Sequence, residues 1–546
     1  MSHVPTTYIF RRKDWGSVAG NMIIIVKFAF CINESIRDGM NQRDRNRRIA
    51  RNTMMLYIRM FFLMIVGLYT SRVVLEALGE ENFGIYNVIG GVVAMFTVIS
   101  GALNSAVSRF ITFEMGKGSA ARLDKVYSTA VTIQMILSVI VVILAEPAGL
   151  WFIDNEMTID PSRIPAARRV LHFSVLSFVI NLMSVPQLAS ITAHERMSAY
   201  AYIGILDGLL RLMVALLIAH SEYDRLVFYA ALMACTVLVV RTAYWIYCRV
   251  NFKECRYRFV FEKGLMREMF SFAGWNFIGV ASGVLRDHGG NILVNMFSGP
   301  AVNAARGMAY QLSGTVQNFV TNFMTAVNPQ ITKSYASGEH EFMFSLVRKA
   351  SRMSYYLLFV LVLPVIFNIE YLLGIWLKDV PDHTALFAGL FMVLALCESV
   401  SHPLVTAMLA TGNIRNYQII VGGLQFLNFP VSYLLLKAGA PPEMTVVVAI
   451  VVSQMCLAAR LLMLKKMISL PVREFLRRVY FNVIAVTLVA LPLPWFVESI
   501  VQEGFIGMCS SVSVCIVSAC ASILLVGCSR VERHELWTML VKRMRS

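Results

Sequence analysis

The sequence returns about fourteen times to hydrophobic runs that are long enough to cross a bilayer, beginning near Met54. A membrane-spanning helix needs about 20 predominantly apolar residues. Because lipid cannot satisfy exposed backbone groups, each run is expected to be a helix that closes its own hydrogen bonds. The chain is therefore predicted to be an all-α polytopic membrane protein with about 14 transmembrane helices. The predicted spans are 53–77, 84–108, 126–152, 169–192, 200–220, 226–248, 270–297, 302–329, 352–374, 385–410, 417–437, 444–466, 478–498 and 504–528.

The composition supports a surface that faces lipid. Only 15% of the 546 residues are charged, whereas a soluble domain carries about 25%, and the mean hydropathy is +0.64. The net charge of +16 does not indicate a nucleic-acid partner, because the basic residues lie in short loops between apolar spans. Nucleic-acid binders gather such residues on a soluble face.

The basic residues also predict the orientation of the chain. With segment 40–51 placed in the cytoplasm, the start segment, the tail and the loops on that side carry 31 Lys and Arg, and the other loops carry 6. Cytoplasmic loops of membrane proteins show this excess. Both termini are therefore expected to be cytoplasmic.

A weak internal repeat suggests how the spans are organised. A shift of 220 residues aligns four apolar residues and two glycines of one half with those of the other. The aligned pairs are Val74/Val294, Gly79/Gly299, Ala106/Ala326, Val107/Val327, Ile111/Ile331 and Gly118/Gly338. Six spans in each copy preserve orientation, so the two halves are expected to be parallel repeats. The predicted domains are an N-lobe at 40–250, a C-lobe at 251–470, and two additional helices with a cytoplasmic tail at 471–546.

The first 39 residues are treated separately. Their apolar stretch from Met22 to Cys31 is too short to span, and no small-residue cleavage site follows it. A basic segment of the kind that precedes a first membrane helix begins at Met40. Residues 1–39 are expected to be a non-native or disordered extension.

Two stretches resemble a known family. SRVVLEALGEENFGIYNVIGGVVAMFTVISGALNSAVSRFITFEMGKG, Ser71 to Gly118, is similar to the first two helices of bacterial polysaccharide-biosynthesis proteins. GGNILVNMFSGPAVNAARGMAYQL, Gly289 to Leu312, is similar to their seventh and eighth helices. These proteins are lipid-linked oligosaccharide flippases of the multidrug/oligosaccharidyl-lipid/polysaccharide exporter superfamily.

The resemblance implies two six-helix lobes around a central cavity that work by alternating access. The implied cargo is a polyprenyl-diphosphate-linked oligosaccharide, which moves from the cytoplasmic to the outer leaflet of the bacterial inner membrane for O-antigen or capsule synthesis. The implied partners are this lipid-linked glycan, membrane lipids, and the glycan polymerase and glycosyltransferases of the same process.

A diphosphate cargo needs fixed positive charge, and arginine binds phosphate with a planar fork that stays protonated. The candidate diphosphate-binding residues are the arginines inside or near the ends of spans: Arg286, Arg59, Arg211, Arg306 and Arg72. The sequence also permits other roles. Arg59, Arg72 and Arg306 could snorkel to an interface, and Arg211 could pair with Asp207 one turn away.

Arg286 is the leading candidate. It lies deep in its span, and the adjacent Asp287 should point about 100° away around the helix. The following Gly289–Gly290 pair could open the helix toward a cavity.

Acidic groups and a histidine within the spans are candidates for ion coupling. Glu398 and His402 lie one turn apart in the tenth span, and such a pair can carry a proton. Asp207 and Asp287 are further candidates. A helix–helix hydrogen bond is the alternative for the Glu398–His402 pair.

The chain contains no sequence motif that is typical of soluble enzymes. The sequence contains no phosphate-binding loop, HExxH or GxSxG pattern, and its ten cysteines are scattered and lie mostly inside apolar runs. We expect no enzymatic activity, metal or cofactor. Two alternative functions stay open: a multidrug or cation exporter of the same superfamily, and a membrane glycan polymerase or ligase.

Overall fold

The computed structural model describes residues 40–94, 96–118, 120–155, 157, 159–219, 221–258, 262–376, 380–498, 500, 504–529 and 532–533. The predicted extension at 1–39 lies outside these residues. The elements, in chain order, are α2 (Met40–Ala94), α3 (Thr97–Lys117), α4 (Ala120–Asn155), η1 (Pro161–Arg163), α5 (Ile164–Met183), α6 (Val185–Ala193), α7 (Met197–Ala219), α8 (Arg225–Asn251), α9 (Lys263–Ala336), α10 (His340–Phe367), α11 (Ile369–Trp376), α12 (Thr384–Ser399), α13 (His402–Thr411), α14 (Arg415–Tyr417), η2 (Gln418–Gly422), α15 (Gly423–Phe426), α16 (Asn428–Lys437), α17 (Met444–Ile468), α18 (Val472–Phe475), η3 (Leu476–Tyr480), α19 (Phe481–Ala490), α20 (Pro492–Glu498), α21 (Phe505–Ser522) and η4 (Ile523–Gly527).

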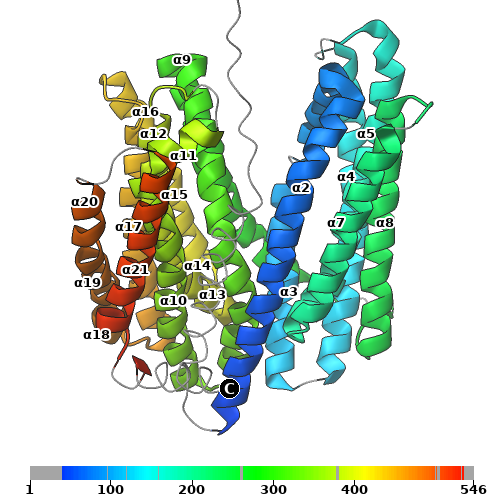
Figure 1. Ribbon diagram of the computed structural model, residues 1–546. Helices are drawn as coiled ribbons and strands as arrows, with labels where there is room; N and C mark the ends of the chain where they lie inside the picture. Colours follow the sequence, from blue (N-terminus) through cyan, green and yellow to red (C-terminus); the bar gives the residue numbers. More distant parts are fainter. Residues whose placement is uncertain are drawn as a thin grey trace, which may run out of the picture.

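Two helical bundles form a V (Figure 1). Helices α2 to α8 make the N-lobe, and α9 to α17 make the C-lobe. The lobes meet at the end of the molecule where α3 finishes at Lys117, which we call the closed end. They diverge toward the opposite end (Figure 1), where α2 breaks at Gly79 and α9 at Gly299, and which we call the open end. The last helices, α18 to α21, lie on the outer side of the C-lobe.

Two glycines divide helices that are too long for single spans. At about 1.5 Å per residue, the 74 residues of α9 would extend far beyond a bilayer of about 30 Å. The chain turns at Gly299, which has a φ of 84° that glycine adopts without strain. Arg306 after the turn donates to the Asp287 carbonyl before it, at 3.2 Å. The two parts of α9 are therefore antiparallel neighbours.

The residues that align at the 220-residue offset have the same structural role in both lobes. Gly79 has a φ of 76° and Gly299 one of 84°, and at the other aligned glycine pair the φ angles are 72° and 79°. All four aligned apolar pairs are buried in both copies. The identities therefore lie at turns and core positions, where the fold constrains the residue type most.

Nine of the described helices are long and apolar enough to span a membrane, and the bent pair α12 and α13 makes a tenth. The divided helices α2 and α9 are not among these, so the total of fourteen remains a prediction. The break between α12 and α13 has an angle of 42°. It divides the tenth predicted span between Glu398 and His402.

Candidate functional site

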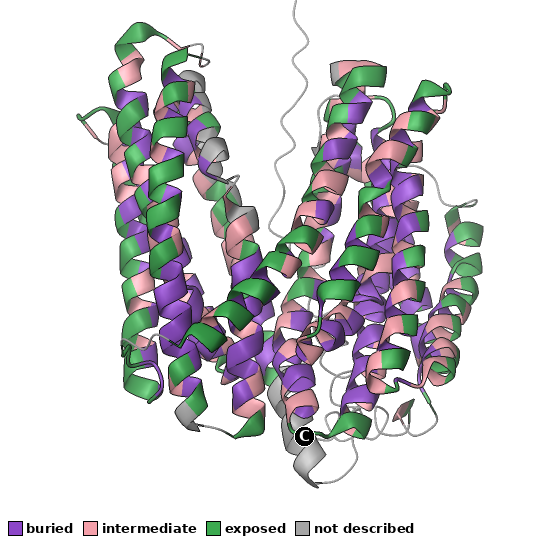
Figure 2. Ribbon diagram, turned by 180° about the vertical axis from the view of Figure 1, so that it is seen from behind, coloured by how far each residue is buried: buried purple, intermediate pink, exposed green. Residues whose placement is uncertain are grey.

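The lobes touch closely at the closed end, where α3 packs against α9. Gly116 permits this approach, because a Cβ at its position would lie 2.7 Å from the Ala336 Cβ and 2.8 Å from the Lys333 carbonyl oxygen. The two residues Gly116 and Ala336 are themselves related by the 220-residue offset, so the contact joins equivalent positions of the two lobes. Buried residues are concentrated around this junction (Figure 2).

Glu195, between α6 and α7, joins the N-lobe to the C-lobe at the same end. Its carboxylate accepts hydrogen bonds from Gln330 and Lys333 of α9, each at 2.7 Å. Its backbone carbonyl accepts from Asn52 of α2 at 3.0 Å. The Glu195 side chain is only 2% exposed, and a buried carboxylate requires such compensation. This group therefore holds three elements of both lobes together.

Arg109 of α3 forms a second contact between the lobes. Its guanidinium lies over the rings of Phe110, Phe113 and Phe272, at 4.7, 4.4 and 5.7 Å from their centroids. It donates to the Ala410 carbonyl at 3.3 Å. The residue is 9% exposed, and its Nε has no hydrogen-bond partner among the described residues.

A polar stripe runs along the second part of α9 between the closed and open ends. Gln311, Thr315, Asn318 and Thr321 recur on one side of the helix and are all exposed. Lipid does not solvate such groups, so we expect this side of α9 to contact water. Helices α9 and α2 stand on the sides of the two lobes that face each other (Figure 1).

The N-lobe gathers three arginines and one aspartate. Arg59 of α2 lies 4.4 Å from the centre of the Tyr200 ring and passes over Gly204 of α7, where a Cβ would lie 2.0 Å from its Nε. Arg211 pairs with Asp207 at 3.0 Å and is 44% exposed. The pairing that the sequence allowed for Arg211 is confirmed.

Arg241 of α8 completes this cluster. It donates to Asn181 of α5 at 2.8 Å, and it interacts electrostatically with both Asp207 and Arg211. Three arginines and one aspartate give the N-lobe cluster a formal charge of +2. The Arg59 Nε is buried without a hydrogen-bond partner in the described part of the chain.

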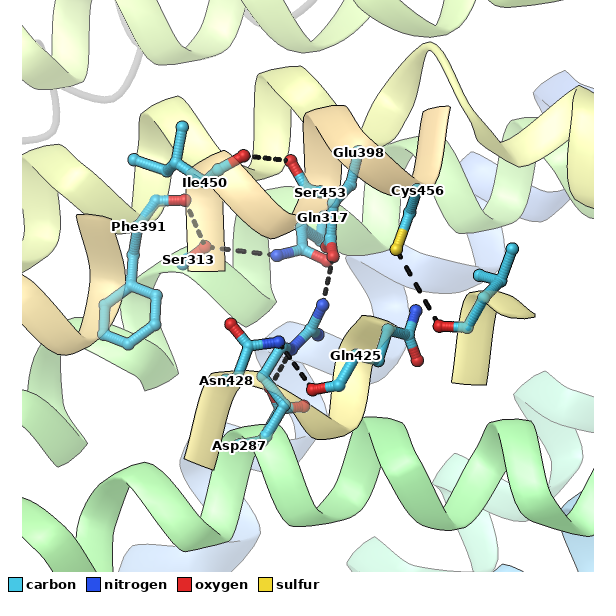
Figure 3. A network of polar contacts seen from close by, with 12 residues as sticks. Asp287, Ser313, Gln317, Phe391, Glu398, Gln425, Asn428, Ile450, Ser453 and Cys456 are labelled. Carbon is cyan, nitrogen blue, oxygen red and sulfur yellow. Dashed lines mark hydrogen bonds and ion pairs between the residues drawn. The ribbon is translucent and has the colours of Figure 1, made fainter. Parts of the chain in front are cut away.

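In the C-lobe, Arg286 is neutralised by two carboxylates. It contacts Asp287 at 2.8 Å and forms a short ion pair with Glu398 of α12. Figure 3 shows Asp287, Glu398 and Asn428 gathered from α9, α12 and α16. The expectation that Asp287 points away from Arg286 is wrong, because the long arginine side chain folds back to its neighbour.

Arg306 is also held inside the C-lobe. It is 4% exposed, donates to the Asn291 side chain, and lies 5.3 Å from the centre of the Phe391 ring. A Cβ at Gly290 would lie 2.3 Å from the Arg306 guanidinium. The snorkelling alternative for Arg306 is therefore wrong. The Gly289–Gly290 pair does not open α9, which stays helical there and uses the missing side chains for close packing.

Of the remaining predicted residues, His402 interacts electrostatically with Glu398 and with Arg460. His402 begins α13, beyond the break that follows Glu398, and its carbonyl accepts from Thr406 at 3.3 Å. Arg72 lies on α2, and its side chain is outside the described part. Two arginines (Arg286 and Arg306) and two carboxylates (Asp287 and Glu398) lie together in the C-lobe, so these four residues carry a formal charge of zero.

Sequence reasoning missed the residues that close the lobes: Asn52, Arg109, Glu195, Gln330 and Lys333. The signal available for Arg109 was its place within an apolar helix. Glu195 and Lys333 lie in predicted loops that are rich in basic residues, where charged side chains are common at the membrane interface. No group of three or more metal-ligating side chains occurs among the described residues.

Comparisons with known proteins agree with this architecture. A family model described as polysaccharide biosynthesis protein matches residues 49–335, just over half of the chain. The uncharacterized membrane protein EpsK of Bacillus subtilis (strain 168) is 18% identical over 293 residues, which are 53% of this chain and 58% of EpsK. The match thus spans less than two thirds of that relative.

Solved structures share the fold. A crystal structure of MATE in complex with MaD3S has a TM-score of 0.67 at 12% identity, covering 80% of this chain and 98% of that one. A MOP superfamily transporter from Pyrococcus furiosus, described by a reverse polarity of its binding pocket, has a TM-score of 0.64 at 11% identity, covering 81% of this chain and 98% of that one.

Proposed function

Because the chain belongs to the polysaccharide biosynthesis protein family, we propose that it flips a polyprenyl-diphosphate-linked oligosaccharide from the cytoplasmic to the outer leaflet by alternating access. The glycan would serve O-antigen or capsule synthesis, and the protein would reside in the bacterial inner membrane. Glycan polymerase and glycosyltransferases are the partners that this role implies.

The uncompensated charge of the N-lobe carries the proposal. Arg59, Arg211 and Arg241 face a single aspartate, and the cluster keeps a formal charge of +2 beside a water-facing polar stripe. An anionic diphosphate is stabilised there, whereas an organic cation is repelled. Arg59 and Arg211 are our first candidates for diphosphate contacts, and the exposed amides and hydroxyls of α9 are candidates for sugar contacts.

Arg286 and Arg306 have a conditional role in this proposal, because they reach a cargo only when their present partners release them. Protonation of Glu398 or Asp287 would release Arg286 and couple the cargo to a proton. His402 and Asp207 are the further ion-coupling candidates. Arg72, which stands nearer the open end on α2, is a candidate for cargo contact during exit.

We also propose that the closed end is cytoplasmic. The excess of basic loop residues supports this orientation, and the described arrangement would then be open to the outside. A cytoplasm-negative potential favours the exit of an anion by about 2.3 kcal/mol per charge at 100 mV. Each uncompensated charge on the diphosphate would gain this amount on export.

The test is leaflet-resolved measurement of the lipid-linked glycan in cells with and without the protein. Loss of the protein should trap the glycan on the cytoplasmic face. Arg211→Gln should reproduce the trapping, while Arg168→Gln, which breaks an exposed pair with Asp154 near the open end, should not. Glycan that reaches the outer leaflet but stays unpolymerised would support a polymerase or ligase instead.

An exporter of drugs or cations is the second candidate, because the fold is shared with MATE structures. The net positive N-lobe argues against it. An unchanged glycan together with lost drug efflux in the same cells would favour the exporter over the flippase.

A further inference from the structure

A pocket of about 490 Å³ lies at the closed end, away from the polar stripe. It is formed where the start of α9 meets Phe110 of α3 and the loop before α14. Pockets that bind small molecules commonly measure about 300–1,000 Å³, so this one is large enough for a polar head group. The function proposed above does not use it.

Two exposed arginines flank the pocket. The Arg415 guanidinium lies 5.4 Å from the centre of the Trp275 ring, and this stacking holds its planar fork at the pocket wall. Arg267, on the first turns of α9, also lines the pocket. Glu268 is the only carboxylate among the described lining residues.

A third arginine lies behind the wall. Arg109 contacts Phe110 and Phe272, which line the pocket, and approaches Gly412, another lining residue. It is buried, and its Nε lacks a hydrogen-bond partner among the described residues. The lining residues Arg267, Arg415 and Glu268 sum to a formal charge of +1, which favours an anion, and Arg109 behind them interacts with Glu268 and with Glu114.

Exposed apolar side chains and a tryptophan lie beside the pocket. Phe270, Phe277 and Ile278 are at least 40% exposed on the same stretch of α9, as expected for a helix side that faces acyl chains. Trp275 has the place that tryptophans commonly occupy at a membrane interface. A ligand with an anionic phosphate and an apolar tail matches both the arginines and this exposed apolar side.

We propose that this pocket binds the phosphate group of a membrane lipid from the leaflet at the closed end. Arg267 and Arg415 would each donate to phosphate oxygens, which the guanidinium fork matches in shape and charge. Two lipids carry this chemistry: an anionic phospholipid and an isoprenoid diphosphate. The proposal depends on neither the transported cargo nor the direction of transport.

The experiment is calorimetric titration of the full chain in neutral detergent. The probes are dihexanoyl phosphatidylglycerol, geranyl diphosphate, dihexanoylglycerol as the phosphate-free analogue, and inorganic phosphate. The Arg267→Gln/Arg415→Gln variant should bind both lipid phosphates at least tenfold more weakly. Arg249→Gln is the matched control, because Arg249 stacks on Trp245 at 5.0 Å but does not line this pocket.

The outcomes separate the alternatives. Unchanged lipid binding by the double variant, equal binding of dihexanoylglycerol, or inorganic phosphate binding as tightly as the lipids would each overturn the proposal. Tighter binding of geranyl diphosphate than of phosphatidylglycerol would assign the pocket to an isoprenoid carrier, and the reverse order to a phospholipid. If the double variant does not fold, Arg415→Lys should still weaken binding about threefold through loss of stacking, and unchanged binding would contradict the proposal.

Discussion

The ammonium of Lys333 and the carboxylate of Glu195 lie 2.7 Å apart across the boundary between the two lobes. The alternating access proposed above would require this boundary to open, and the pair would then separate. A buried ion pair of this kind adds little to overall stability but penalises any state in which one charge loses its partner. The pair therefore helps to determine which end of the molecule is closed.

Glu195→Gln should loosen the closed end. The substitution leaves Lys333 without its counter-charge, and breaking a buried pair costs about 3–5 kcal/mol. Hydrogen–deuterium exchange should accelerate at the backbone amides of 326–336. Adding Lys333→Gln should restore part of the protection, since no charge is then left uncompensated. Arg478→Gln, which removes an exposed pair with Glu474, should change exchange little, and equal exchange in all variants would refute this role.

Gly116→Ala should push the lobes apart at the closed end. The added methyl group would lie 2.7 Å from the Ala336 Cβ and 2.9 Å from the Lys333 Cα, and the backbone cannot yield as a flexible side chain does. Spin labels at positions 122 and 341 should report longer distances. Gly101→Ala in the same helix has nothing within 4 Å of the new methyl group and should leave the distances unchanged. Shorter or equal distances for Gly116→Ala would contradict the packing argument.

Arg286→Ala should destabilise the C-lobe, because it leaves Asp287 and Glu398 without their shared cation. The expected loss is about 3–5 kcal/mol. The double variant Arg286→Ala/Glu398→Gln should recover part of it, since one carboxylate is then neutral. Thermal unfolding of the purified chain measures this coupling. If the losses of stability caused by Arg286→Ala and by Glu398→Gln simply add, the ion pair does not stabilise the C-lobe. Arg286 could then bind cargo without first losing its carboxylate partners.

A low pH should reduce the stability of the closed end through Glu254. This residue lies in the loop after α8 and pairs with His194 at the end of α6. Burial raises the pKa of this carboxyl, but hydrogen bonds from His194 and from its own backbone amide lower it further, so the pKa lies below its ordinary value of 4.5. A depressed carboxyl pKa contributes stability above pH 4.5 that is lost as the pH falls through the folded-state value.

Thermal unfolding of the full chain between pH 3.5 and pH 7 checks this dependence. Glu254→Gln should lower the unfolding temperature near neutral pH and flatten its decline in acid. Glu341→Gln, at the exposed start of α10, should show the same pH dependence of the unfolding temperature as the unaltered chain. An unchanged acid decline in Glu254→Gln would assign the pH dependence to other groups.

The sequence predicted the fold class because membrane helices are encoded locally. A run of apolar residues specifies a span by its length alone, and the turns at Gly79 and Gly299 require a backbone that glycine adopts without strain. The repeat was detectable for the same reason. Its few identities fall on the core and turn positions that tolerate least change.

The side-chain contacts could not be predicted in the same way. Arg286 and Glu398 are 112 residues apart, and Glu195 and Lys333 are 138 apart, so no local pattern joins them. Neighbouring residues such as Arg286 and Asp287 do leave a helix about 100° apart, but this angle does not separate their charged groups. The arginine side chain is long enough to reach back to the carboxylate. The Gly289–Gly290 pair was interpreted as a helix break, whereas its function is to admit Arg306 and Phe429 at short range.

The equivalence of Gly116 and Ala336 has a consequence for the origin of the molecule. A half-length ancestor that paired with itself would have placed one identical residue on both sides of its symmetry axis, and a small residue there would have served both subunits. After two such copies are fused, the residues of each half can change independently. The position that corresponds to Lys333 is Phe113, a ring beneath Arg109, so the junction between the two copies is held by an ion pair on one side and by aromatic stacking on the other.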